Sequence, residues 1–294
     1  DPLPSVELPL SLKAMLFRRG LCSPEQVMLL LNDQPLPAAN EHFPELIPAL
    51  TRLKKACLNQ EAVAICGDYD ADGMTSTALL MRAFEAMGAR PQAAIPSRMA
   101  DGYGLNKGMV EQLYDEGVRL LVTVDNGVAA HEALDKASEL GVEVILTDHH
   151  TLPSSRPTAL ALIHPSTTPK ESPYACLAGV GLAYVLARAL AAELKNPASI
   201  NTARDLFCIG TVADMAPLTG ANRTLLREGL VHLHQSNCPG VQALQQLAGL
   251  GDRPLRADDI GFQLAPRINA VGRIGEPSLV VDLLTADDPN RAFE

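Results

Sequence analysis

The chain has 294 residues, of which 47% are hydrophobic and 20% charged, and its formal net charge is −10. These values are ordinary for a globular protein with a sizeable core, and they exclude a disordered, collagen-like or fibrous chain. The acidic balance also excludes a protein that coats duplex DNA, because non-specific affinity comes from lysine and arginine side chains that neutralise phosphates.

No segment approaches the ~18 consecutive apolar residues of a membrane span, and the N-terminal sequence lacks the pattern of a signal peptide. The six cysteines are scattered and form no CxxC pair, which is typical of reduced thiols rather than of a disulfide framework. We therefore expect a soluble, cytoplasmic protein with no membrane partner.

The first 60 residues are rich in proline and contain two segments with helical apolar spacing, 23–31 and 46–58. Ser23 followed by Pro24 is typical of an N-cap and the first position of a helix. We expect residues 1–60 to form an N-terminal helical preamble.

Short apolar runs alternate with segments of helical length over residues 61–218. The alternation predicts βαβ units, and the nearly continuous apolar character of the runs predicts strands buried on both faces. The expected fold class is α/β, with a mostly parallel sheet flanked by helices over 61–218 and a helical C-terminal part over 219–294. The expected strands are 62–66, 119–124, 142–147 and 159–163, and the expected helices are 74–87, 106–114, 129–140, 177–194, 203–212 and 222–234.

The first expected strand is followed by GDYDADG, in which Asp68, Asp70 and Asp72 occupy every second position. In an extended chain this spacing places the three carboxylates on one side, which is costly unless a cation neutralises them. The pattern indicates a divalent metal with oxygen ligands. A solvated acidic turn that caps the next helix is the alternative.

The next two expected strands also end in polar groups. Asp125 lies in VDNG, and TDHH contains Asp148, His149 and His150. An acid beside two histidines offers an imidazole ligand, an imidazole that acts on a substrate, and a carboxylate that orients them. Each group alone is compatible with an ordinary turn or an exposed loop. Because all the clusters follow buried parallel strands, we expect them at one edge of the sheet, where open α/β folds bind ligands.

Asp214, in TVADMAPL, is a single acid in an apolar stretch, and such a carboxylate is costly to bury unless it is paired or binds a metal. An N-cap or a surface turn is the alternative. The acids and one imidazole together suit two divalent cations, Mn²⁺ or Mg²⁺, better than a thiolate-rich zinc site. Two such ions clamp the attacking and leaving oxygens of a phosphoryl displacement, which predicts hydrolysis of a phosphate ester. The predicted ligands are Asp70, Asp72, Asp125, His149 and Asp214.

GDYDADG, VDNG, TDHH and TVADMAPL, in this order, resemble the four motifs of the DHH phosphoesterase superfamily. Three further segments, IPSRMADGYGLN, LAGVGLAYVL and LAPRINAVGRIG, resemble the bacterial RecJ family of single-stranded-DNA-specific exonucleases. The resemblance covers the chain from about residue 60 to its end.

The resemblance implies a role for each matching ligand. Asp125 would bridge the two metals and take part in catalysis, and Asp70 would bind one of these metals. Asp72, His149 and Asp214 would bind the other.

The resemblance also implies residues that act on the substrate. His150 would contact the scissile phosphate and stabilise its developing charge, with Asp68 and Asp148 as supporting carboxylates behind the ligands. The residues implied to hold the 5′ phosphate and the terminal nucleotide are Arg98, Tyr103 and Arg273.

The sequence departs from the family pattern in two places. Many DHH proteins have a histidine ligand four residues before the position of Asp70, where this chain has Cys66, so one metal would be weakly held or completed by solvent. The family's DHHA1-type domain, with its Gly-Gly-His signature, and the OB-fold of RecJ proteins have no counterpart in the sequence. We expect a catalytic-core fragment in which residues 219–294 lead toward the DHHA1-type domain.

The implied function is metal-dependent hydrolysis of single-stranded DNA from the 5′ end, releasing 5′ mononucleotides, in DNA recombination and repair. The implied partners are single-stranded DNA, a single-strand binding protein and a helicase, and the protein would be a monomer. Two alternatives stay open: a DHH phosphodiesterase that acts on short oligoribonucleotides or cyclic dinucleotides, and a non-catalytic replication scaffold.

Overall fold

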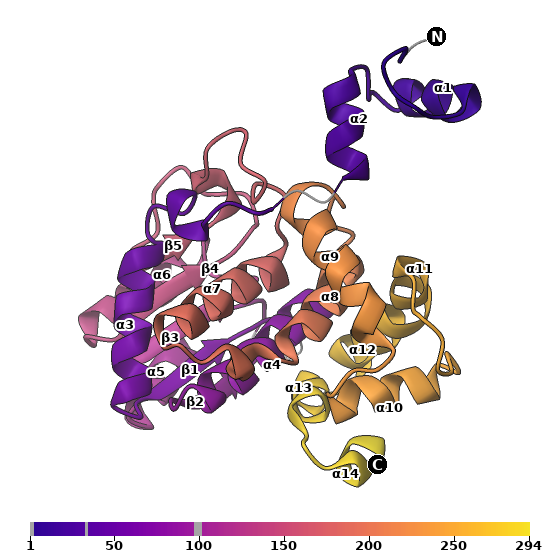
Figure 1. Ribbon diagram of the computed structural model, residues 1–294. Helices are drawn as coiled ribbons and strands as arrows, with labels where there is room; N and C mark the ends of the chain where they lie inside the picture. Colours follow the sequence, from indigo (N-terminus) through magenta and orange to yellow (C-terminus); the bar gives the residue numbers. More distant parts are fainter. Residues whose placement is uncertain (1–2, 33–34, 97–101) are drawn as a thin grey trace. The chain divides into compact units, whose positions relative to one another are not determined.

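The computed structural model describes residues 3–32, 35–96 and 102–294, and the chain divides into two compact units, Asp1–Pro37 and Ala38–Glu294 (Figure 1). The expected boundary at residue 60 falls inside the larger unit. The helix over Leu46–Leu58 therefore belongs to the same unit as the sheet, whereas the sequence groups it with the preamble.

The described part of the smaller unit contains α1 (Leu10–Arg18) and α2 (Pro24–Leu31). α2 begins as predicted. The Ser23 hydroxyl accepts a hydrogen bond from the backbone amide of Gln26, and Oε1 of the Gln26 side chain accepts one from the backbone amide of Ser23. The sequence does not predict α1, several of whose apolar side chains stay exposed. The small core of this unit contains Leu3, Val6, Leu16 and Val27.

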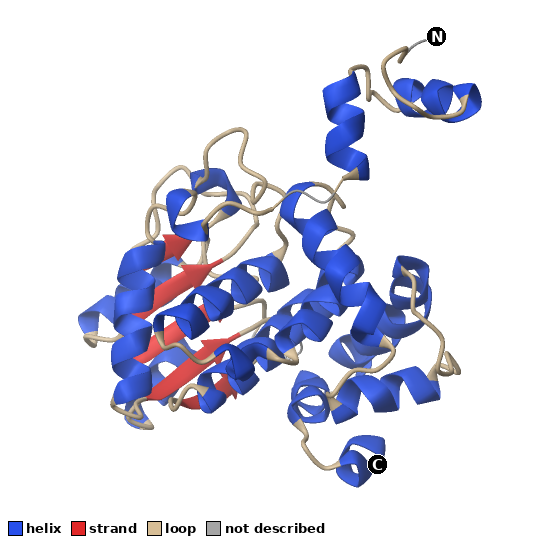
Figure 2. Cartoon of the chain, in the orientation of Figure 1, coloured by secondary structure: helices blue, strands red, loops and turns tan. Residues whose placement is uncertain are grey.

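The larger unit is built on a sheet whose five strands, as far as the described residues go, are all parallel (Figure 2). The mostly parallel sheet is confirmed. In the order β2-β1-β3-β4-β5, the three strands that precede the acidic motifs are direct neighbours, so their carboxyl ends meet at one place. The strands are β1 (Ala62–Cys66), β2 (Arg90–Ala94), β3 (Leu120–Val124), β4 (Glu143–Thr147) and β5 (Ala161–Ile163).

The sequence does not predict β2, which lies at one edge of the sheet. Its sequence RPQAA is short of apolar residues and contains Pro91, a residue that sheets accept mainly on edge strands. The strand is only partly buried, unlike β3, in which all five residues are buried. An edge strand needs no continuous apolar run, and so it leaves no such signal in the sequence.

Helices cover both faces of the sheet (Figures 1 and 2). On one face, α3, α4 and α7 pack on the strands and on one another, and α8 packs on α4 and α7. On the other face, α5 and α6 enclose an apolar core with side chains of β1, β3 and β4. The bounds are α3 (Leu46–Leu58), α4 (Ala71–Ala86), α5 (Lys107–Asp115), α6 (His131–Glu139), α7 (Gly179–Glu193) and α8 (Ala203–Ala213).

The C-terminal part of the described chain is helical, as expected for 219–294. α9 packs on α8, and α12 reaches back to contact α4 and α8. The elements are α9 (Gly220–Leu233), α10 (Pro239–Leu247), α11 (Ala257–Asp259), the π-helical turn Ile260–Leu264, α12 (Ala265–Ile274), α13 (Pro277–Thr285) and α14 (Pro289–Phe293). Short 3₁₀ turns lie at Ala39–Glu41, Pro165–Thr167 and Pro197–Ile200.

Among the helices that the structure describes, none combines the length and the apolar character that a membrane crossing requires.

Candidate metal centre at the carboxyl edge of the sheet

Asp70 lies four residues after the end of β1 and caps the helix that follows. One of its carboxylate oxygens, Oδ1, accepts hydrogen bonds from the amides of Asp72, at 2.8 Å, and Gly73, at 3.0 Å. α4 therefore begins at Ala71, three residues earlier than predicted, because an aspartate N-cap satisfies the free amides of the first turn. The cap holds the Asp70 carboxylate at the sheet edge.

Asp72 is fully buried and is held by a helix from a distant part of the chain. The amides of Gly179 and Val180, at the start of α7, donate to its two carboxylate oxygens, each at 2.8 Å. Burial and the carboxylates of Asp125 and Asp214 raise the pKa of Asp72 well above its usual value. The two amide donors and the positive end of the helix dipole act in the opposite direction and fix the carboxylate in one orientation.

Asp125, the residue after β3, is buried and has a backbone φ of +62°. This left-handed conformation is uncommon outside glycine, and such strain is often found at functional sites. Its Oδ1 atom receives no hydrogen bond from the described residues, although His149 Nε2 lies 2.9 Å away. Burial and the charges of Asp68 and Asp70 raise its pKa well above the usual value.

Among the described residues, the side chains form three overlapping sets of donor atoms, and within each set the atoms lie within 4.8 Å of one another. Two of these sets bring together residues that the family resemblance assigns to the same metal. In the second set, His149 Nε2 lies 3.7 Å from Asp72 Oδ2. The first set is Asp68, Asp70 and Asp125, the second is Asp72, His149 and Asp214, and the third, which overlaps both, is Asp125, His149 and His150.

Asp68 joins the first set as a potential ligand, whereas the sequence places it only in a supporting role. It is buried, and burial together with the charge of Asp70 raises its pKa to about 7. Gly73 permits this packing, because a Cβ atom there would lie 1.7 Å from Asp68 Oδ1. A metal-free cluster of this kind is electrostatically unfavourable, so the donor set fits hard divalent cations.

His150 is held by Asp148, as the supporting role of that carboxylate predicts. Asp148 Oδ1 accepts from the His150 amide at 3.0 Å and contacts His150 Nδ1 at 2.8 Å, while Oδ2 accepts from the Val128 amide at 3.0 Å. Burial opposes ionisation of Asp148, but these hydrogen bonds outweigh it and lower its pKa. The same contact raises the pKa of His150. The half-exposed ring has Nε2 left to act on a substrate.

Tyr103 lies beside this cluster. Its hydroxyl donates to the Asp125 carbonyl at 3.1 Å, and its ring centroid is 6.1 Å from that of His150. Arg98, which the resemblance assigns to the 5′ phosphate, lies outside the described residues. Tyr103 is thus brought to the site, whereas the position of Arg98 stays a prediction.

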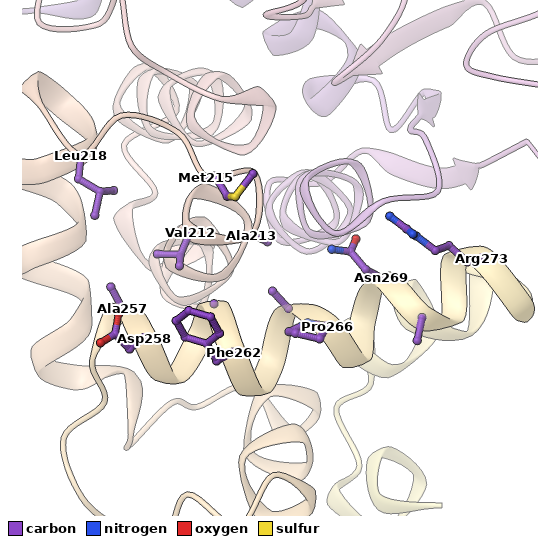
Figure 3. A pocket seen from close by; sticks show the side chains of 13 residues that line it. Val212, Ala213, Met215, Leu218, Ala257, Asp258, Phe262, Pro266, Asn269 and Arg273 are labelled. Carbon is purple, nitrogen blue, oxygen red and sulfur yellow. The ribbon is translucent and has the colours of Figure 1, made fainter.

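Arg273 lies on α12 and lines a groove next to the cluster (Figure 3). α12 is anchored to the start of α4, because Asn269 Oδ1 accepts a hydrogen bond from the Ala71 amide at 2.8 Å. Gly272 allows the close approach, since a Cβ atom there would lie 1.8 Å from the Tyr69 carbonyl oxygen. The Arg273 end of the groove therefore adjoins the loop that carries Asp70.

Cys66 belongs to none of these donor sets. Its side chain is fully buried in the apolar core that α5 and α6 form with the sheet, and burial raises the pKa of its thiol to about 12. A neutral, buried thiol is a core residue rather than a metal ligand.

Three hydrogen-bonding groups near the site were not identified by sequence reasoning. The buried side chain of Asn126 donates hydrogen bonds through Nδ2 to the carbonyl oxygens of Cys66 and Val124, at the ends of β1 and β3. Its Oδ1 atom accepts a hydrogen bond from the backbone amide of Leu105, so these strand ends are joined to the segment after Tyr103. The other two are the amides at the start of α7 and His164 at the end of β5. His164 follows an apolar run, as the acidic motifs do. Its position directly after an expected strand is the signal from which the sequence could have identified it.

Comparison with known proteins gives consistent results. The sequence pattern of "DHH family, N-terminal domain" matches residues 62–211. The single-stranded-DNA-specific exonuclease RecJ of Dickeya dadantii is 38% identical over 98% of this chain and 52% of that protein, and the RecJ of Bacillus subtilis is 37% identical over 96% and 35%. The chain thus spans about half or less of the length of these relatives.

The solved structures agree. A crystal structure of exonuclease RecJ bound to manganese matches with a TM-score of 0.77 and 37% identity, covering 89% of this chain and 64% of that one. The Mn²⁺ complex of RecJ from Thermus thermophilus matches with a TM-score of 0.79 and 35% identity, over 96% and 40%. Because the family pattern spans just over half of the sequence and includes the strands that lead to the acidic motifs, the chain belongs to the DHH family.

Proposed function

We propose that this chain hydrolyses single-stranded DNA from the 5′ end in a metal-dependent reaction that releases 5′ mononucleotides. The observation that carries the proposal is the pair of adjacent donor sets around Asp125, with His150 beside them. The RecJ relatives, whose names specify single-stranded DNA, support the choice of substrate.

The first and second donor sets would suit two divalent cations, Mn²⁺ or Mg²⁺, and Asp125 links them because it also shares the third set with His149. Asp125 Oδ1 is a buried carboxylate oxygen without a hydrogen-bond donor among the described residues, which is the environment that a cation stabilises. When bound, such ions stabilise charge on the phosphate and make an attacking water more acidic.

The protein residues orient the reacting groups. The helix cap at Asp70 and the α7 amides at Asp72 hold two carboxylates before any substrate arrives. Asp148 fixes the His150 ring through Nδ1, which leaves Nε2 to donate a hydrogen bond to the scissile phosphate as charge develops. Since Asp148 raises the pKa of His150, the ring keeps a donor at Nε2 over a wider pH range.

The groove beside α12 supports a single strand as the substrate. Figure 3 shows Met215 and Phe262 at this groove, with Asn269 and Arg273 further along it. The side chains of Met215 and Phe262 are 87% and 76% exposed, so bases that are not paired in a duplex can pack on them. Arg273 supplies one cation for a phosphate.

We also propose the finer features that the resemblance implies. These are a catalytic domain over 61–218, a cytoplasmic location, a monomeric state, and a single-strand binding protein and a helicase as partners. The resemblance of the motifs to RecJ proteins supports them.

The test is product analysis on the 294-residue chain with Mn²⁺. A 5′-labelled single strand should yield labelled mononucleotide from the first time point, and the same sequence in a blunt duplex should be cut far more slowly. Asp125→Asn is the control for contaminating nuclease. A labelled ladder, or preferential cleavage of oligoribonucleotides or a cyclic dinucleotide, would contradict the proposal, and an inactive wild-type chain would favour a non-catalytic scaffold.

A further inference from the structure

His164 is a buried histidine that none of the roles above uses. It follows β5, the strand next to β4, and is only 1% exposed. Both ring nitrogens have main-chain partners: Nδ1 lies 3.0 Å from the Ser166 amide nitrogen, and Nε2 lies 2.8 Å from the His150 carbonyl oxygen.

These two partners define one protonation state of the ring. A backbone amide can only donate, so Nδ1 must be the unprotonated acceptor for Ser166. A carbonyl oxygen can only accept, so Nε2 must carry the proton that it donates to His150. The geometry thus requires the neutral imidazole with its proton on Nε2.

The hydrogen bond to His150 completes the support of that residue. The His150 amide donates to Asp148 Oδ1 at 3.0 Å, and its carbonyl accepts from His164. The peptide groups on both sides of the His150 Cα atom are therefore held, which fixes the direction of its Cα–Cβ bond. The Asp148 contact to Nδ1 then sets the rotation of the ring.

We propose that His164 is a positioning residue that places His150 for the reaction by holding its carbonyl group. The inference rests on the proposed hydrolysis, because it assigns His164 a role through His150. It differs from a purely structural role, in which His164 would only cap the 3₁₀ turn Pro165–Thr167 through Ser166. The two roles use different ring nitrogens, so they can be separated by substitution.

The matched pair is His164→Gln and His164→Leu. Both variants have side chains of similar size, and neither places an acceptor two bonds from Cβ, where Nδ1 of the wild-type ring accepts from the Ser166 amide. Only glutamine retains an N–H donor with the reach of Nε2. We expect His164→Leu to lower kcat by about 10-fold or more with KM changed less than about threefold, and His164→Gln to retain kcat within about threefold of wild type.

A second readout does not depend on activity. Amide hydrogen exchange at His150 should become faster in His164→Leu than in His164→Gln. Without the hydrogen bond to the His150 carbonyl, the neighbouring peptide group, which carries the His150 amide, should open more often. In wild type, ¹⁵N NMR should show Nδ1 unprotonated and Nε2 protonated.

Equal kcat values and equal exchange rates for the two variants would overturn the proposal and leave the cap as the role of His164. The proposal would also be overturned if ¹⁵N NMR of the wild-type protein showed that Nδ1 of His164 carries the proton. A wild-type chain that cleaves no oligonucleotide would contradict the proposed hydrolysis instead, and the exchange rates would still decide whether His164 holds His150.

Discussion

Asp125 combines a strained backbone and full burial with the nearby charges of four acids, Asp68, Asp70, Asp148 and Asp214. Its φ of +62° costs roughly 1 kcal/mol or more for a residue other than glycine. Its carboxylate is close enough to Asp68 and Asp70 for all three to share one cation. Such a residue is unfavourable for the metal-free fold, and we attribute its presence to the site.

We expect Asp125→Asn to lower hydrolysis by more than about 1000-fold, because its carboxylate belongs to the first donor set and shares the third with His149 of the second. Asparagine tolerates positive φ, so the metal-free thermal midpoint should not fall. The control, Cys66→Ala, should keep its rate of hydrolysis within about tenfold of wild type. Its free energy of unfolding should fall by about 1 kcal/mol, because the substitution leaves a small cavity. Initial rates with Mn²⁺ and thermal unfolding measure both effects, and comparable losses of rate would refute the bridging role.

The acid cluster also predicts how pH affects metal-free stability. The folded-state pKa of Asp68 is about 7 against an ordinary value of 3.8, and the pKa values of Asp72 and Asp125 are raised in the same direction. Between about pH 4 and about pH 7 the folded chain binds more protons than the unfolded chain, so stability falls as pH rises. The pKa of Asp148 is lowered, so this carboxylate affects the pH dependence of stability only at pH values below this window.

In EDTA, the thermal midpoint should therefore fall by about 4 °C or more from about pH 5 to about pH 7.5. Mn²⁺ should abolish or reverse the trend, because cation binding favours the ionised carboxylates. Asp125→Asn should flatten the metal-free curve. A metal-free midpoint that rises over this range would show that the cluster is not the dominant titrating group.

At the scale of elements, α7 connects a remote segment to the metal site. Its first amides hold Asp72, and its first residue lies against Asp125. A Cβ atom on Gly179 would come within 2.6 Å of Asp125 Cβ and 2.8 Å of Asp125 Oδ1. Real Cβ atoms do not approach this closely, so the start of α7 depends on glycine at this position.

Gly179→Ala should lower Mn²⁺ affinity and the rate of hydrolysis, each by about tenfold or more, because α7 must retreat from both aspartates. Gly181→Ala is the matched control, since the three atoms nearest its Cβ atom, from 2.8 Å, belong to the flexible side chain of Leu177 rather than to an aspartate. Both changes raise helix propensity by roughly 1 kcal/mol, so propensity cannot explain a difference between them. Calorimetric Mn²⁺ titration measures the affinities, and equal affinities for the two variants would refute the role of Gly179.

At the scale of the whole molecule, net charge limits the affinity that the chain could have for the single-stranded DNA of the proposed function. With 34 acidic and 24 basic residues, few phosphates can be neutralised at once. We expect Asp125→Asn protein to bind a single strand weakly in Mn²⁺, with a slope of log affinity against log salt smaller in magnitude than about 2.

Fluorescence anisotropy between about 50 and 200 mM salt measures this slope. Arg273→Ala in the same background should reduce its magnitude by about 0.7, the effect of one phosphate contact on a single strand. A steep slope, or tight binding at physiological salt, would show that a larger basic surface contributes to binding.

The sequence by itself determined the α/β class and identified most of the residues that the structure brings together in the cluster. Apolar runs identify β1, β3, β4 and β5, and the carboxyl ends of parallel strands meet at one edge, so the order of the motifs was enough to group Asp70, Asp125 and His149. The fold prediction and membership of the DHH family are confirmed. The roles of the individual site residues stay predictions until the variants are measured.

Only the tertiary structure decided which distant groups support that cluster. Gly179 holds Asp72 from 107 residues away, Asn269 reaches Ala71 from 198 residues away, and His164 holds His150 from the next strand. It also placed Cys66 in the core and added β2 as an edge strand. Local periodicity records which face of an element is apolar, but close contacts between elements depend on how the whole chain packs, and no short segment encodes them.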